Sequence, residues 1–241
     1  MCFKKKFEFI RHYTNVGALF NILDNGIRFS KPNPNWDDQN DFFTLEKYKQ
    51  HLNETGGKKE VFLICFCEDL GNVHHWYYYG SSNSNTMYEN CYENIKCNIK
   101  LNKSKFDELL KRQNPSLRLK PLHYVLSSSS ATTKPEKGTM TLEEYLTDWD
   151  KLLYVKRREY YVEQEWRVVA VAEQQPPSID IKECIEAITI LIDEGSFIFS
   201  HIKEMIACKY PNLKCKVLNS GVHKSKTWEI EINKIIKEKL K

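Results

Sequence analysis

The segment Tyr161-Val-Glu-Gln-Glu-Trp-Arg-Val-Val-Ala170 contains two glutamates two positions apart within a run that is otherwise typical of a β-strand. Because side chains alternate between the faces of a strand, Glu163, Glu165 and Arg167 are expected on one face and the mostly apolar residues on the other. Glutamate is a poor strand former, so this pair requires a reason beyond β-propensity. The pattern indicates either a functional site or an edge strand whose solvated face carries a cross-strand ion pair.

Length and composition allow a sizeable core. The chain has 241 residues, 41% of them hydrophobic, and we predict a single domain over residues 1–241 with a lysine-rich C-terminal segment. No run approaches the ~18 apolar residues of a membrane span, and residues 1–7 lack a signal-peptide hydrophobic region, so we expect a soluble cytoplasmic protein without a membrane partner. None of the eight cysteines forms a C-x-x-C pair, which predicts neither a metal site nor a disulfide framework.

Hydrophobic periodicity predicts strands and helices that intermix along the chain. The continuous apolar run Val61-Phe-Leu-Ile-Cys-Phe-Cys67 predicts a strand buried on both faces near the centre of a sheet. Other strands are predicted near residues 7–13, 95–101 and 187–192. Helices are predicted after a cap at Thr14 or Asn15, from the capping box Thr141-Leu-Glu-Glu144 and after Gly195. Loops are predicted at 35–41, as a site rim or an ordinary surface loop, and at 113–139. The absence of regular βαβ alternation favours an α+β domain built on a mixed sheet.

Several common sites are excluded by the sequence. None of the nine glycines belongs to a G-x-G-x-x-G or P-loop pattern, which excludes a Rossmann domain and a P-loop NTPase. No G-x-S-x-G is present either. The adjacent pair His74-His75 does not converge in a strand or a helix, so it is a weak metal signal.

The segment from His12 to Phe29, with the sequence HYTNVGALFNILDNGIRF, resembles the opening of the ADP-ribosyltransferase fold. In poly(ADP-ribose) polymerases and in DarT-type toxins that modify DNA, an H-x-S/T strand end precedes a helix of the form N-x-x-x-I-L-x-x-G-L/I. A late strand bearing E-x-E, here Glu163-Gln-Glu165, is the other hallmark of many members of that fold.

The order of motifs is also similar to that of a bacterial domain-of-unknown-function family marked by C-F-x-E, W-x-x-Y-G and E-x-E-W-R. The corresponding segments here are Cys65-Phe-Cys-Glu68, Trp76-Tyr-Tyr-Tyr-Gly80 and Glu163-Gln-Glu-Trp-Arg167. This resemblance covers most of residues 9–170. The middle serine-threonine-serine motif of many toxin members is absent, and Cys65-Phe-Cys67 stands in its place.

The resemblance implies a mixed, split β-sheet of the ADP-ribosyltransferase type with short flanking helices. It also implies a mono-ADP-ribosyltransferase that uses NAD as a substrate, of the kind found in bacterial toxins and anti-phage effectors. A carboxylate near the scissile bond can stabilise the oxocarbenium-like state formed when the nicotinamide–ribose bond breaks. By resemblance, Glu165 fills that role and holds the ribose 2′-hydroxyl, while Glu163 orients or deprotonates the acceptor.

The resemblance assigns NAD contacts to residues at the end of the first strand. His12 and Thr14 are expected to hydrogen-bond NAD, and the backbone of Tyr13 to hold the carboxamide. Trp76 and Tyr79 offer aromatic faces on which nicotinamide stacks, although clusters of this kind also occur as core. These assignments require His12, Thr14 and Glu165 to converge in one cleft.

The acceptor and the partners stay open in the sequence. Residues 201–241 hold ten lysines and four glutamates, which favours nucleic acid as the acceptor unless these lysines are merely solvated. The alternatives are a protein-directed enzyme that modifies arginine, and a non-catalytic module that senses a nucleotide or a partner. A neutralising antitoxin protein is a further partner expected of a toxin.

Overall fold

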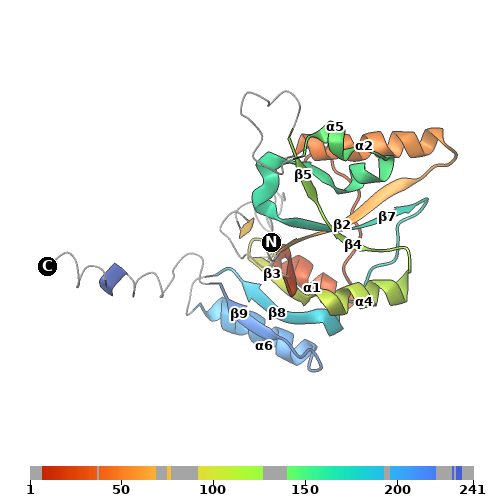
Figure 1. Ribbon diagram of the computed structural model, residues 1–241. Helices are drawn as coiled ribbons and strands as arrows, with labels where there is room; N and C mark the ends of the chain where they lie inside the picture. The colour runs from red at the N-terminus through yellow and green to blue at the C-terminus, as the bar shows by residue number, and fades with distance from the viewer. Residues whose placement is uncertain are drawn as a thin grey trace. The chain divides into compact units, whose positions relative to one another are not determined.

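The computed structural model describes residues 7–36, 38–68, 75–76, 92–126, 140–192, 196–220, 230 and 232–234. It has an α+β fold with a mixed seven-stranded sheet and several helices, which confirms the predicted class (Figure 1). Contacts between Cα atoms divide the chain into two compact units, where the sequence favours one domain. The first unit comprises residues 1–12, 21–70 and 101–184, and the second comprises residues 13–20, 71–100 and 185–241.

The strands of the first unit run in the order β4-β7-β2-β1, and each neighbouring pair is antiparallel. Their bounds are Leu119–Pro121 for β4, Glu165–Ala172 for β7, Glu60–Glu68 for β2 and Phe9–Asn15 for β1. Strand β2 lies between two neighbours and is buried on both faces, as its continuous apolar run predicts. Strand β7 also has a neighbour on each side, so the interpretation as an edge strand is wrong.

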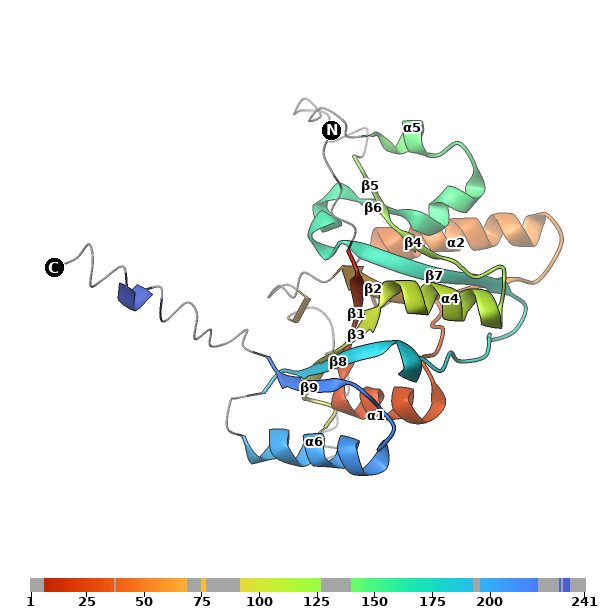
Figure 2. The same ribbon diagram turned by 60° about the horizontal axis from the view of Figure 1, so that its bottom comes forward.

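Two helices cover opposite faces of the β2–β7 pair, as Figures 1 and 2 both show. Helix α2, Gln39–Glu54, packs Leu45 and Tyr48 against Leu63 and Val169 of the strands. Helix α4, Lys103–Gln113, places the ring of Phe106 5.1 Å from that of Phe66. Helix α2 contradicts part of the loop predicted at 35–41, because Asp38 caps the helix and accepts from the N–H groups of Asn40 and Asp41.

Short elements connect β4 to β7 within the first unit. They are β5 His123–Val125, α5 Leu142–Tyr145, and then η2 Trp149–Tyr154, β6 Val155–Arg157 and η3 Arg158–Glu163. The capping box of Thr141 and Glu144 is confirmed, although α5 is only one turn long. Strands β4 and β5 lie within the span 113–139 that was predicted as a loop, and residues 127–139 are outside the described part of the chain.

The second unit contains the strand order β3-β8-β9, with β8 and β9 parallel. The bounds are Lys96–Asn102 for β3, Ile185–Ile190 for β8, Lys216–Asn219 for β9 and Phe197–Lys209 for helix α6. Helix α1, Val16–Asn25, starts where Asn15 accepts from the N–H of Ala18 at 2.8 Å, as its capping pattern predicts. The short helix η4, Lys182–Cys184, belongs to the first unit.

Candidate functional site

The register of the first unit places three polar side chains in one row across β1, β2 and β7. Arg11 is paired with Cys67, and Cys67 is paired with Glu165. Directly opposed residues of antiparallel strands project to the same face of a sheet. Arg11 and Glu165 therefore lie on the face that α2 covers, two strand spacings or about 10 Å apart.

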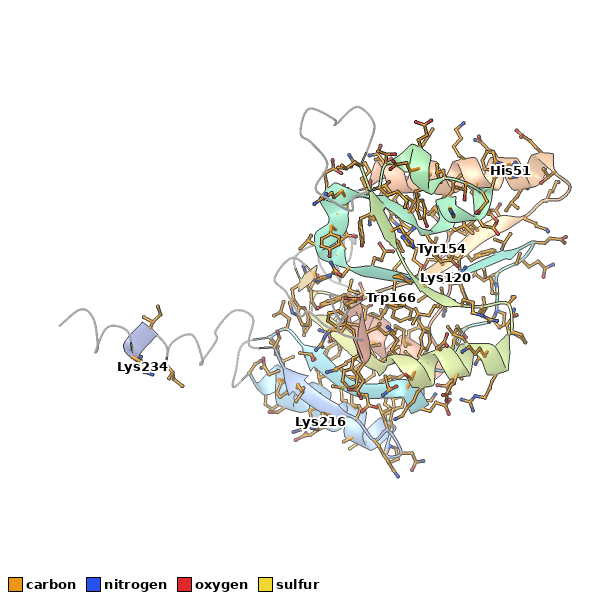
Figure 3. All side chains as sticks on the ribbon, viewed as in Figure 1. His51, Lys120, Tyr154, Trp166, Lys216 and Lys234 are labelled. Atoms are coloured by element: carbon orange, nitrogen blue, oxygen red, sulfur yellow. The ribbon has the colours of Figure 1, made fainter. Side chains whose placement is uncertain are left out.

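His12 projects to the opposite face, which α4 covers. Its ring lies 5.7 Å from that of Phe66, and Phe66 is paired with Trp166 rather than with Glu165. Trp166, which Figure 3 labels, donates from Nε1 to Glu68 at 3.0 Å on this same side. The expected convergence of His12 and Glu165 in one cleft is therefore wrong, because neighbouring residues of β1 face opposite ways.

The His12 ring has a structural role instead. Its Nδ1 lies 3.0 Å from the carbonyl oxygen of Cys65, which can only accept, so Nδ1 carries the proton. Burial lowers the pKa of His12, and the carbonyl opposes that effect only in part. The ring is therefore neutral near pH 7 and tied to β2.

The charged face of β7 is buried, and its charges form one connected network. Arg167 donates from Nε to Glu165 Oε1 at 2.5 Å and from Nη1 to Asp41 Oδ1 at 3.0 Å. Lys156 donates to Glu163 Oε2 at 2.6 Å and to Glu165 Oε2 at 3.1 Å. All five side chains are less than a tenth exposed, so the alternative of a solvated ion pair is wrong. Three acids and two bases leave this network with a net charge of −1.

The two glutamates reach Lys156 by different backbone routes. Strand β7 begins at Glu165, whereas Glu163 ends the helix η3, so the prediction that both lie in one strand is wrong. Between them Gln164 adopts a left-handed conformation with φ 46°. Such a residue reverses the local path of the chain, and it brings two carboxylates to one ammonium group.

Ion pairing keeps Glu165 charged despite its burial. Burial alone would raise the pKa of Glu165, but the nearby Arg167 and Lys156 outweigh it and lower that pKa to about 2. Burial likewise opposes the charge on Lys156, and the two glutamates outweigh it and raise the pKa of that amine. In contrast, burial and the charge of Glu165 hold the pKa of the Cys65 and Cys67 thiols well above their usual range. The row therefore contains an ionised carboxylate beside neutral thiols.

The remaining residues assigned by resemblance belong to the second unit. Tyr13 is buried, and its ring stacks on His75 at 5.2 Å and meets Trp76 edge-on at 5.2 Å. Trp76 is only 4% exposed and its carbonyl accepts from Lys96, so it is a core residue rather than an open stacking face. Thr14 is half-buried in β1. Tyr79 is outside the described residues.

Three charged residues on the face of Glu165 are not among those that the sequence selects: Arg11, Asp41 and Lys156. Arg11 directly precedes His12, which the resemblance assigns to NAD. Only the pairing of β1 with β2 shows which of these two side chains shares a face of the sheet with Glu165. Asp41 lay in a segment predicted as a loop. Lys156 stands seven residues before Glu163, and a basic residue close to an acidic pair in sequence was the one available signal.

Comparison of the chain with protein-family models, with curated proteins and with solved structures gives no match. Among the described residues, no group of three or more His, Cys, Asp or Glu side chains is placed to hold a metal ion. Within the same part of the chain, no helix combines the length and the apolar character needed to cross a bilayer.

Proposed function

We propose that this chain is a mono-ADP-ribosyltransferase that cleaves the nicotinamide–ribose bond of NAD at Glu165. The observation that carries the proposal is the row Arg11–Cys67–Glu165, which holds a cation and an ionised carboxylate on one face of the sheet. The motif order described from the sequence supports the same chemistry. His12 has no part in it.

The row supplies the two charges that NAD cleavage needs. A carboxylate that is already ionised and fixed can stabilise the positive charge that develops on the ribose as nicotinamide leaves. A guanidinium group about two strands away is suited to the pyrophosphate, because its planar fork binds phosphate oxygens in pairs. Glu163 lies beside Glu165 on the same ammonium group and is the candidate for orienting the acceptor.

Nicotinamide release from NAD tests the proposal directly. We expect the wild-type chain to release nicotinamide, and Glu165→Gln to lose at least about 10²-fold of that rate, comparable with removal of one preorganised electrostatic group. Because Glu165 is buried in an ion network, rates must be expressed per folded molecule, with the folded fraction measured by near-UV circular dichroism. Release at the wild-type rate by folded Glu165→Gln would exclude the catalytic assignment.

One observation favours a second function, a nucleotide-binding module without turnover. Both carboxylate oxygens of Glu165 already accept from cations, and the side chain is only 4% exposed. A carboxylate that is bound to two cations in this way has a structural role unless a ligand displaces one of those cations. Saturable binding of NAD by calorimetry without any nicotinamide release would support this second function and refute the first.

A further inference from the structure

The short parallel sheet of the first unit brings a tyrosine and a lysine to the paired glutamates. Strand β5 pairs with β6 so that Tyr124 is the register partner of Lys156. Lys156 reaches both glutamates, and Tyr124 Oη accepts from the backbone N–H of Glu165 at 2.8 Å. A tyrosine 41 residues from Glu165 in sequence and a lysine nine residues from it therefore meet at the start of β7.

The Tyr124 hydroxyl has a donor that no described residue uses. A phenol both accepts and donates, and the N–H of Glu165 takes up its accepting side. Within the described residues this is the one hydrogen bond at Tyr124 Oη, so its proton is left to donate. Burial, reinforced by the charge of Glu165, raises the pKa of Tyr124, and the hydroxyl therefore keeps its proton at physiological pH.

Tyr124 packs against a neighbouring ring and is more exposed than the two glutamates. Its ring meets that of Tyr161 edge-on, with centroids 5.4 Å apart. Tyr124 is half-buried, whereas Glu163 and Glu165 are each 4% exposed. Of these three side chains, that of Tyr124 is therefore the most exposed.

We propose that Tyr124 is a ribose-binding residue, whose O–H donates to a hydroxyl oxygen of the sugar held at Glu165. The inference rests on the proposed function and names a contact for the ribosyl part of the substrate. The hydroxyls of ribose both donate and accept. Carboxylates supply only acceptors and Lys156 supplies only charged donors, so Tyr124 contributes the neutral donor that completes the set.

Calorimetric binding of ADP-ribose and of ADP to the full chain isolates this contact, because the two ligands differ by the terminal ribose. We expect the wild-type chain to bind ADP-ribose about tenfold more tightly than ADP. In Tyr124→Phe, which keeps the ring but removes the hydroxyl, this preference should disappear. Measuring both ligands with both proteins gives a thermodynamic cycle, in which any general effect of the substitution on folding cancels.

Tyr48→Phe is the matched control. Tyr48 also has a buried ring and a hydrogen-bonded hydroxyl, 2.8 Å from Asp150, and it belongs to the same unit. This variant should lose similar thermal stability and keep the wild-type preference for ADP-ribose. Equal affinity of the wild-type chain for ADP-ribose and ADP overturns the inference whether or not Tyr124→Phe folds.

The outcomes separate this inference from the proposed function. Preference for ADP-ribose that survives in folded Tyr124→Phe overturns the ribose contact, even if the wild-type chain releases nicotinamide. Loss of the preference in Tyr124→Phe without nicotinamide release from NAD retains the contact and overturns the enzyme. Failure of the wild-type chain to bind ADP-ribose overturns the contact.

Discussion

Glu165 links the stability of the first unit to pH, because its charge is held by two buried cations. Its pKa is about 2 in the folded chain, below the ordinary value of 4.5. A carboxyl group with a lowered pKa stabilises the fold at pH values above its unfolded pKa, and this stabilisation is lost as the pH falls toward the folded pKa. We expect the midpoint of denaturant unfolding to decrease steadily from pH 5 to pH 2.

Glu165→Gln should flatten that pH dependence and lower stability at pH 7. The sequence alone suggests little effect on stability, but the structure shows that the change leaves Arg167 and Lys156 with one fewer anion in a buried site. Loss of one partner from a buried ion pair costs about 3 kcal/mol or more in the free energy of unfolding. Unfolding at pH 7 and pH 3 measures both effects, and a variant as stable as the wild type at pH 7 would contradict this account.

Arg11 and His12 are adjacent residues for which the structure predicts opposite results. Arg11→Gln should raise the KM for NAD about tenfold or more, because it removes the guanidinium group that we propose binds the pyrophosphate on the face of Glu165. His12→Gln should leave that KM unchanged, since the ring projects to the other face and bonds Cys65. Steady-state rates of nicotinamide release by the two variants show which face of the sheet binds NAD. A larger effect of His12→Gln would restore the assignment made from the sequence.

At the scale of elements, Gly26 fixes the exit of α1. Its φ is 81°, and a Cβ added there would lie 2.7 Å from the carbonyl oxygen of Ile179, with which Ile27 forms a β-bridge. Gly26→Ala should lower the free energy of unfolding by more than about 1 kcal/mol, through both the positive φ and the clash. Gly57→Ala is the matched control, because φ is not positive there and its nearest neighbour is the Lys59 side chain at 3.9 Å. Thermal unfolding of both variants tests the difference.

The buried charge network links helix α2 and strand β6 to strand β7. Asp41 from α2 and Lys156 from β6 bind the same strand, β7, through Arg167 and Glu165. Hydrophobic packing of α2 on β2 brings these charges together, and the charges then favour one register over its neighbours. The same network holds the site that we propose as catalytic.

At the scale of the whole molecule, the acceptor is the open part of the proposed function. If the acceptor is nucleic acid, the ten lysines of residues 201–241 should neutralise phosphates, and modification should fall steeply with salt. Charge reversal at Lys224 and Lys226, which lie outside the described residues, should reduce nucleic-acid modification and spare nicotinamide release into water. Gel assays across a salt series measure both. Labelling of a protein arginine that does not depend on salt would indicate the alternative acceptor.

The sequence by itself determined the local elements of this protein. The apolar run of β2, the cap of α1 at Asn15 and the capping box at Thr141 depend on neighbours in the chain, so their patterns predicted them correctly. The sequence also selected Glu165 as unusual, because a charged residue at the start of an apolar strand requires compensation, and the structure shows that Glu165 is buried and ion-paired.

Only the tertiary structure decided which residues share the site. Alternation along β1 places Arg11 and His12 on opposite faces, but a slip of one residue between β1 and β2 would exchange them, so the register is not contained in either strand. Tyr124 and Lys156 likewise reach Glu165, and Asp41 reaches Arg167, through contacts that form only in the folded chain. Residues that meet only in the folded sheet leave no periodic pattern in the sequence. Strand pairing therefore decides which side chains share a face of the sheet with Glu165.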